Sequence, residues 1–192
     1  REVVSYRGIS TTVASAGGDY RECVELILEA MVQSPRFIYR VENQRGDGEL
    51  WPVGEYELAS RLSYILWGSS PDEELLKAAG AGKLSDRNFL AAQARRMLAN
   101  PRARKQSARF IEDWLNLERL DNMAPSRKLF PNWDRALAQD MRRETMAFFD
   151  EVVWHKRRPF WDLLNAQVTF ATPRLAKHYG IEPGGKGLVR YE

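Results

Sequence analysis

The chain has little of what most metal and cofactor sites are built from. Its 192 residues include one cysteine, Cys23, and two histidines, His155 and His178. A single cysteine excludes an internal disulfide, a zinc knuckle and a haem-attachment motif, which all need more than one cysteine. A carboxylate-bridged di-iron bundle needs a histidine three residues after a glutamate on two helices, and neither histidine follows a glutamate in that way. We therefore expect no cofactor and no metal ion in this chain.

Long apolar runs are also missing. The longest have four residues, as in Tyr64–Trp67 and Phe89–Ala92, whereas a membrane-spanning helix needs about 20. We therefore expect no membrane span, and the sequence shows no signal peptide. Its hydrophobic content of 44% is nevertheless that of an ordinary globular chain, and this is enough for a sizeable core.

The sequence also lacks a strong excess of positive or negative charge. Lysine and arginine total 29 and aspartate and glutamate total 26, which leaves a net charge of +3. Basic residues cluster at 95–96 and 156–158, and Arg102, Lys105 and Arg109 share one face of a predicted helix. Acidic residues are interleaved with them, as on an ordinary solvated helix. Nucleic acid binding is therefore the weakest of the functional hypotheses.

Signals that start and stop helices are abundant. Apolar residues at Leu58, Leu62, Ile65 and Leu66 form a stripe with helical spacing, and Gly68 suits the left-handed conformation just past a helix end. After it, Ser70 is a good N-cap, Pro71 fits the first helical position, and the acidic residues 72–74 favour the positive end of the helix dipole. The stretch predicts one helix, its end and the start of the next.

Similar signals predict the rest of the chain. Residues 1–18 are β-branched and small, and are expected to be extended; residues 43–54 are expected to form a surface loop. Helices are predicted over about 19–33, 55–67, 71–79, 85–99, 100–117, 134–154 and 172–179, with a turn or short helix at 162–165 and one strand at 187–191. The predicted fold class is all-α: an irregular antiparallel bundle of about six or seven helices with an extended N-terminal segment.

Few side chains are candidates for chemistry. Glu144 lies in mid-helix, where pairing with a basic residue of another helix is favoured over a role as a lone acid. His178 is interpreted as a cap or packing residue and His155 as a helix-end residue, with a catalytic base as the alternative. Arg61 and Asp72 are expected to bond to chain ends and to each other. Glu144 and His178 remain the catalytic candidates.

Two tryptophans lie in predicted loops. Most of the six tryptophans are expected to pack in the core or at helix junctions. Trp51 and Trp133 are the exceptions, because an aromatic ring in a loop can form a surface for a sugar or a partner protein. They are the candidate ligand or partner surface of this chain.

Six blocks in order along nearly the whole chain point to a known family. They are Phe37–Glu42 (FIYRVE), Leu58–Leu76, Leu90–Arg104, Phe110–Asp121, Met141–Phe149 and Asp162–Ile181. Together they resemble the uncharacterised helical domain of large planctomycete-type secreted multidomain proteins, which often carry a c-type cytochrome-like domain. The preceding part resembles the small companion domain of those proteins. The resemblance implies a companion domain at residues 1–40 and a main helical domain at 41–192.

The resemblance implies a context more than a reaction. Such proteins are usually exported, which implies a periplasmic or cell-surface location, and they continue past the point where this chain ends. Any c-type haem would belong to a neighbouring domain, and the partners would be the other domains of the parent protein. We therefore expect a non-catalytic docking or architectural module. The alternative is part of an extracytoplasmic enzyme acting on polysaccharide, with its site completed by missing domains.

Overall fold

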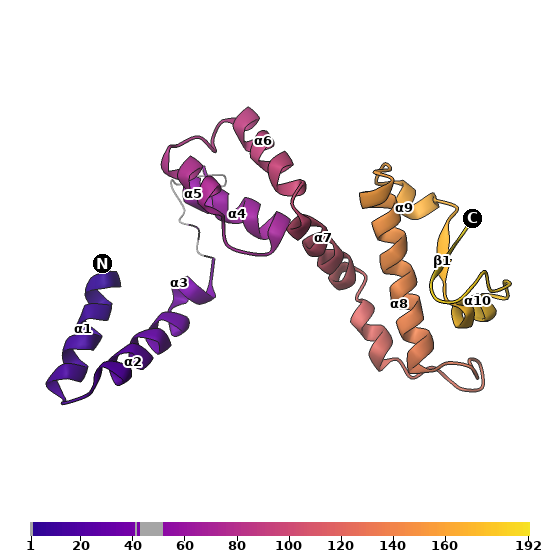
Figure 1. Cartoon of the computed structure of the whole chain (residues 1–192), viewed down its shortest axis with the longest axis horizontal. Helices are drawn as coiled ribbons and strands as arrows, with labels where there is room; N and C mark the ends of the chain where they lie inside the picture. Colours follow the sequence, from indigo (N-terminus) through magenta and orange to yellow (C-terminus); the bar gives the residue numbers. More distant parts are fainter. Residues whose placement is uncertain (1, 41, 43–51) are drawn as a thin grey trace.

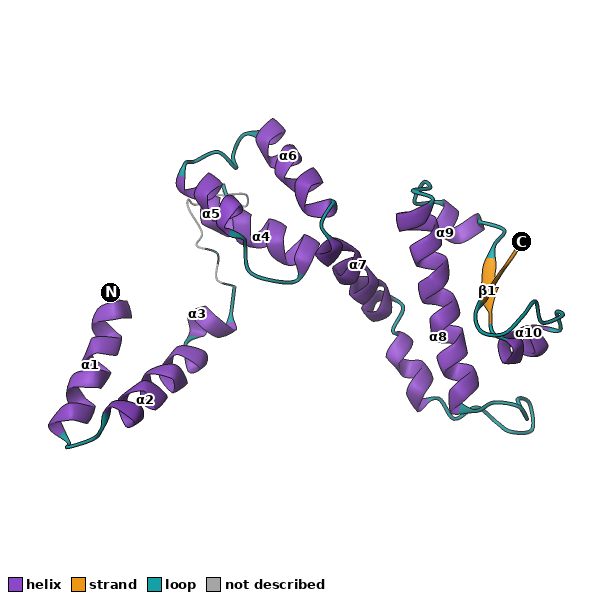
Figure 2. Cartoon of the chain, in the orientation of Figure 1, coloured by secondary structure: helices purple, strands orange, loops and turns teal. Residues whose placement is uncertain are grey.

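The computed structural model describes residues 2–40, 42 and 52–192. These residues are mostly helical and include one pair of short strands (Figure 2). The all-α class predicted from the sequence is confirmed. The described residues form ten α-helices rather than six or seven, because α1, α3 and α9 add to those expected. The helical elements are α1 (Glu2–Ser15), α2 (Tyr20–Gln33), α3 (Pro35–Ile38), α4 (Glu55–Trp67), α5 (Glu73–Gly80), α6 (Arg87–Leu98), α7 (Pro101–Trp114), the 3₁₀ helix η1 (Leu117–Asn122), α8 (Arg135–Phe149), the π-helix η2 (Asp150–His155), α9 (Asp162–Asn165) and α10 (Pro173–Tyr179).

The helices form an elongated array in which each packs mainly against its neighbours in the chain (Figure 1). Helix α1 packs on α2, α4 packs on α5, α6 and α7, and α8 packs on η1 and α10. The buried side chains accordingly form separate clusters instead of one bundle core. The first cluster includes Leu75, Leu84 and Met97 from the region of α4–α7. The second includes Leu137 and Leu175 and joins α8 to α10.

The expectation of an extended N-terminal segment is wrong. Residues Glu2–Ser15 form helix α1, although the β-branched residues in this stretch have modest helix propensity. Two of the hydroxyl side chains bond to the preceding turn, Thr11 to the carbonyl of Arg7 and Thr12 to that of Gly8, both at 3.0 Å. Packing against α2, where Val13 is buried, overrides the weak local preference. The predicted domain boundary at residues 40 and 41 remains a prediction.

The junction between α4 and α5 follows the sequence signals with one change. Gly68 ends α4 with φ of +63°, as predicted from its position. The N-cap of α5 is Asp72 and not Ser70: the Asp72 carboxylate accepts a hydrogen bond from the backbone N–H of Leu75 at 3.0 Å. Both residue types cap well, so sequence alone did not discriminate between them. The same shift occurs at α6, where Asp86 rather than Ser85 is the N-cap.

Helix α8 and the segment after it form the C-terminal half. The predicted helix over about 134–154 is confirmed as α8, capped by Asp134, and its continuation as η2. Thr172 caps α10 and Gly180 ends it, as predicted. The predicted strand is β2 (Val189–Tyr191), which pairs antiparallel with β1 (Thr169–Ala171). None of the helices in the described ranges has the length and apolarity needed to cross a membrane.

Candidate functional site

The first candidate residue, Glu144, lies on α8 facing β1 and α10. One carboxylate oxygen accepts a hydrogen bond from the hydroxyl of Thr169, and the other accepts one from the hydroxyl of Tyr179 at 2.6 Å. Among the described residues, Glu144 has no ion-pair partner, so the favoured expectation of a basic partner is wrong. The neighbouring Arg142 pairs instead with Glu112, at 2.9 Å. The periodicity could not show this, because hydroxyl and guanidinium donors suit a carboxylate equally well.

Glu144 and Tyr179 line a cavity of about 570 Å³ between η1, α8 and α10. Its other walls are partly apolar, with Leu120 and Met141, and partly polar, with Asn116, Arg119 and Thr145. Burial raises the pKa of the Tyr179 phenol, and the hydrogen bond to Glu144 raises it further. The phenol therefore donates to the carboxylate and is not an activated base. The arrangement fixes α10 on α8.

The histidines lie apart from this cavity. His155 lies at the end of η2, where its Nε2 is 3.1 Å from a carboxylate oxygen of Asp150 and 3.2 Å from the guanidinium of Arg104. Its position agrees with the interpretation as a helix-end residue. His178 is exposed on α10 beside the ring of Tyr179, at 5.7 Å between centroids. The structure therefore does not bring Glu144, His155 and His178 together into one constellation.

Of the two loop tryptophans, Trp51 lies outside the described residues. Trp133 is half-buried, packs against the second cluster, and donates a hydrogen bond from its indole N–H to the carbonyl of Met123 at 3.3 Å. The prediction that Trp133 lies in a loop is confirmed. The ring nevertheless serves packing, because it lies against the cluster that joins the first turn of α8 to β1 and α10.

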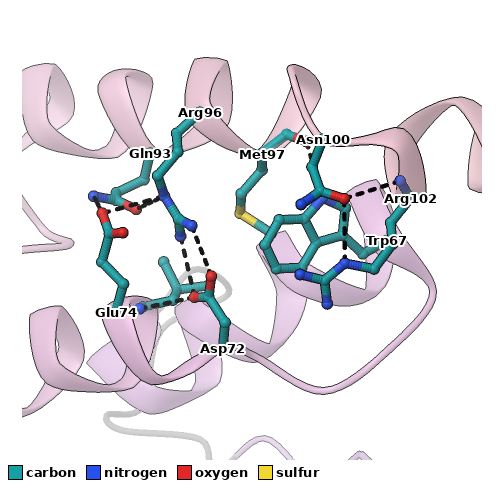
Figure 3. A network of polar contacts seen from close by, with 9 residues as sticks. Trp67, Asp72, Glu74, Gln93, Arg96, Met97, Asn100 and Arg102 are labelled. Atoms are coloured by element: carbon teal, nitrogen blue, oxygen red, sulfur yellow. Dashed lines mark hydrogen bonds and ion pairs between the residues drawn. The ribbon is translucent and has the colours of Figure 1, made fainter.

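The most connected polar group joins α4, α5, α6 and α7 around Trp67 (Figure 3). The indole N–H of Trp67 donates to the carbonyl of Met97 at 2.9 Å. Arg96 forms a two-pronged bond with Asp72, at 2.6 and 3.1 Å, which lowers the pKa of that carboxyl. The prediction that Asp72 and Arg61 bond to each other is wrong, since Arg61 pairs with Glu42. These contacts lock the helix junctions by side-chain bonds in addition to apolar packing.

A groove beside Trp67 is another feature that the sequence did not predict. Arg102, Lys105 and Arg109 of α7, interpreted from the sequence as a solvated helix face, line a groove of about 520 Å³. The guanidinium of Arg102 lies 3.6 Å from the centroid of the Trp67 ring. The i, i+3, i+7 spacing was visible in the sequence, but the opposite wall comes from the end of α4. Across the described ranges, no group of three or more His, Cys, Asp or Glu residues could hold a metal ion.

A family model matches the region that contains both of these sites. It covers residues 53–181 and describes a protein of unknown function, DUF1592, also called PSD4. The chain belongs to the DUF1592 family. No curated protein and no solved structure matches it. The expectation of an uncharacterised helical domain is therefore confirmed at the level of the family.

The DUF1592 region covers helices α4 to α10. It begins just before α4 and ends just after α10, so it includes both buried clusters, the Trp67 junction and the Glu144 cavity. Helices α1, α2 and α3 precede it, and β2 follows it. The residues of the Trp67 junction and of the Glu144 cavity thus lie within the DUF1592 region.

Proposed function

We propose that this DUF1592 domain is a non-catalytic docking or architectural module of an extracytoplasmic multidomain protein. The observation that carries the proposal is its accessible surface of 14,449 Å². A compact monomer of 22.1 kDa exposes about 9,300 Å². The excess means that the chain is extended rather than compact, so more of its surface is open to other polypeptide.

The exposed side chains support this proposal. Phe110 and Trp114 on α7 are 59% and 57% exposed, and their rings stack at 6.1 Å. Further large apolar residues on other elements are also exposed, among them Leu28, Leu129, Phe130, Trp161 and Leu164. Large exposed apolar patches on soluble proteins mark interaction sites. Such a surface suits a domain that packs on others.

The polar groups support the non-catalytic part of the proposal. Asp72 caps α5 and binds Arg96, Glu144 binds two hydroxyls, and Asp150 binds Arg104 and His155. Each of these carboxylates joins one helical element to another segment. Glu144 and Tyr179 do share a cavity, but there the phenol donates to the carboxylate and is not an activated base.

The wider context rests on the sequence resemblance. The six matching blocks support a setting in planctomycete-type secreted proteins, at the periplasm or cell surface. In such a protein the partners are neighbouring domains, and a c-type haem would be held by one of them. This chain then positions a redox domain and takes no part in electron transfer itself.

The test is to prepare this chain and the remaining domains of its gene product separately and to titrate one into the other by calorimetry. We expect binding with a negative heat-capacity change, the mark of apolar burial. Hydrogen exchange should then slow at the exposed stretches of α7. Absence of binding between the two preparations would refute a docking role. A haem absorbance spectrum of the remaining domains checks the redox context.

The alternative, an enzyme acting on polysaccharide with its site completed by missing domains, drew its support from Trp51 and Trp133. Trp133 packs on the second cluster, and Trp51 lies outside the described residues. No observation in the described structure favours this alternative over docking. Release of reducing sugar by the full gene product, lost when this domain is deleted, would reverse that preference.

A further inference from the structure

The groove beside Trp67 is the strongest unassigned feature of the molecule. It has a volume of about 520 Å³, within the usual range for ligand sites. One wall is the end of α4 with Trp67 and Ser69, and the other is α7 with Arg102, Lys105 and Arg109. The two walls come from segments more than 30 residues apart in sequence, and they meet because α4 packs on α7.

Among the described residues, the three cations of this groove form no ion pair with a carboxylate, although Arg102 lies near enough to Asp72 to help lower the pKa of that carboxyl. Other arginines of the same region are paired: Arg96 with Asp72, and Arg104, also on α7, with Asp150. The one acid that lines the groove, Glu112, is already bonded to Arg142 at 2.9 Å. The groove therefore presents a net positive charge.

Arg102 is held in place before any ligand arrives. Its guanidinium lies over Trp67 at 3.6 Å, and its Nε donates to the side-chain oxygen of Asn100 at 3.3 Å (Figure 3). Within the described structure, its two terminal nitrogens have no hydrogen-bond partner. An arginine fixed by stacking loses less side-chain entropy when it binds a carboxylate. A guanidinium fixed in this way binds a ligand carboxylate better than a mobile, solvated guanidinium does.

A second polar group of the groove is unsatisfied. The hydroxyl of Ser69 is buried and has no hydrogen-bond partner in the described part of the chain. Gly68 next to it allows the side chain of Gln106 to lie close, since a Cβ at Gly68 would meet the Gln106 amide oxygen at 2.2 Å. A buried hydroxyl without a partner is costly, and this one has almost no surface that a ligand in the groove can reach, so Ser69 belongs to the groove wall.

The groove continues into an apolar stripe. Gln106, Phe110 and Trp114 follow one another at i, i+4 and i+8 on α7, so they lie on one line of the helix surface. Phe110 and Trp114 are the stacked, exposed aromatic pair. A ligand that filled both parts would carry acidic groups followed by apolar groups.

We propose that this groove and stripe form a docking site for an acidic, amphipathic segment of a partner polypeptide. Charge complementarity with the three free cations selects acidic side chains, and the Phe110–Trp114 pair selects an apolar residue beside them. A nucleic acid is disfavoured because the free cations occupy about two turns of one helix and the chain has a net charge of only +3. The inference rests on the docking role proposed above and names its partner.

The experiment measures fluorescence anisotropy of a labelled peptide made of glutamate and leucine, with the whole chain. The variant K105E/R109E reverses two exposed, unpaired charges and should weaken binding about tenfold or more. The matched control R87E/R95E makes the same charge change on exposed positions of α6 and should bind like the parent. A peptide with glutamine in place of glutamate should bind poorly. Equal binding by K105E/R109E and by the control would overturn the proposal.

Two further arms separate the alternatives. Tighter binding of single-stranded DNA or of an oligouronate than of the peptide would overturn the assignment of a polypeptide partner. If K105E/R109E still binds the remaining domains of the gene product like the parent, this site is wrong while the docking role stands.

Discussion

Asp72 combines a helix cap and an ion pair in one side chain, and the two contributions can be separated by mutation. Its carboxylate accepts the Leu75 N–H at 3.0 Å and binds the Arg96 guanidinium at 2.6 Å. Losing an N-cap costs about 1 kcal/mol. The side chains of Arg96 and Asp72 are 31% and 26% exposed, so the pair is half-buried and contributes about 1 kcal/mol.

We therefore expect Asp72→Ala to lower the free energy of unfolding by about 2 kcal/mol. Asp72→Asn should lower it by about 1 kcal/mol, because asparagine caps a helix as well as aspartate does but lacks the charge. The loss is smaller than for a fully buried ion pair, since Arg96 also has Glu74 at 3.2 Å and is not left as an unpaired buried charge. Urea unfolding followed by circular dichroism measures these differences.

The pH dependence provides an independent check. Arg96 holds the pKa of Asp72 below its ordinary value, so the charged form is favoured in the folded state. Its contribution is complete above the pKa of unfolded aspartate, about 4, and is lost as the pH falls through the lowered folded value. The stability gap between parent and Asp72→Asn should thus close in acid. A gap that persists at about pH 2, or an Asp72→Asn variant as unstable as Asp72→Ala, would refute this account.

Three other substitutions test separate features. Ser63→Ala should raise the free energy of unfolding by about 1 kcal/mol, because the Ser63 hydroxyl is buried with no partner in the described structure and alanine is the better helix former; chemical denaturation decides it. Gly68→Ala should lower the free energy of unfolding by more than about 1 kcal/mol in melting experiments, because Gly68 has a positive φ and the Gln106 side chain lies close to it. Adding Gln106→Ala should restore only the stability that is lost through the clash with Gln106. Tyr179→Phe should cost about 0.5 kcal/mol at neutral pH. Above about pH 10 the parent should lose stability more steeply than Tyr179→Phe, because only the folded state, through burial and Glu144, keeps the phenol protonated.

Local signals predicted most helix boundaries in this chain. Gly68, Asn100 with Pro101, Thr172 with Pro173, and Gly180 end or begin helices where their backbone preferences indicate. These residues act within one turn of their own position, so their effect is visible in sequence. Helix α1 was missed because its Thr and Val residues are poor helix formers when considered alone, and its packing on α2 is a tertiary effect.

The polar contacts between elements were predicted less well. Arg61 was expected to bind Asp72, yet it binds Glu42, and Asp72, the N-cap of α5, binds Arg96 of the next helix, α6. Glu144 was expected to find a cation and instead binds Thr169 and Tyr179. A charged side chain has many compatible partners in a sequence of 29 basic and 26 acidic residues, and only the packing of helices selects among them.

The same limit applies to apolar stripes, and it explains why the docking surface could not be predicted from sequence. Phe110 and Ile111 are adjacent apolar residues of α7, yet Ile111 is buried and Phe110 is 59% exposed. An apolar stripe records that a helix face needs covering; it does not record whether the covering segment belongs to the same chain. In a compact domain, the segment that covers an apolar stripe belongs to the same chain. In this elongated array (Figure 1) the described residues leave part of the α7 stripe uncovered, and that stripe lies beside Arg102, Lys105 and Arg109, which form no ion pair among those residues. That coincidence of free charge and free apolar surface on one helix is what favours a partner with both.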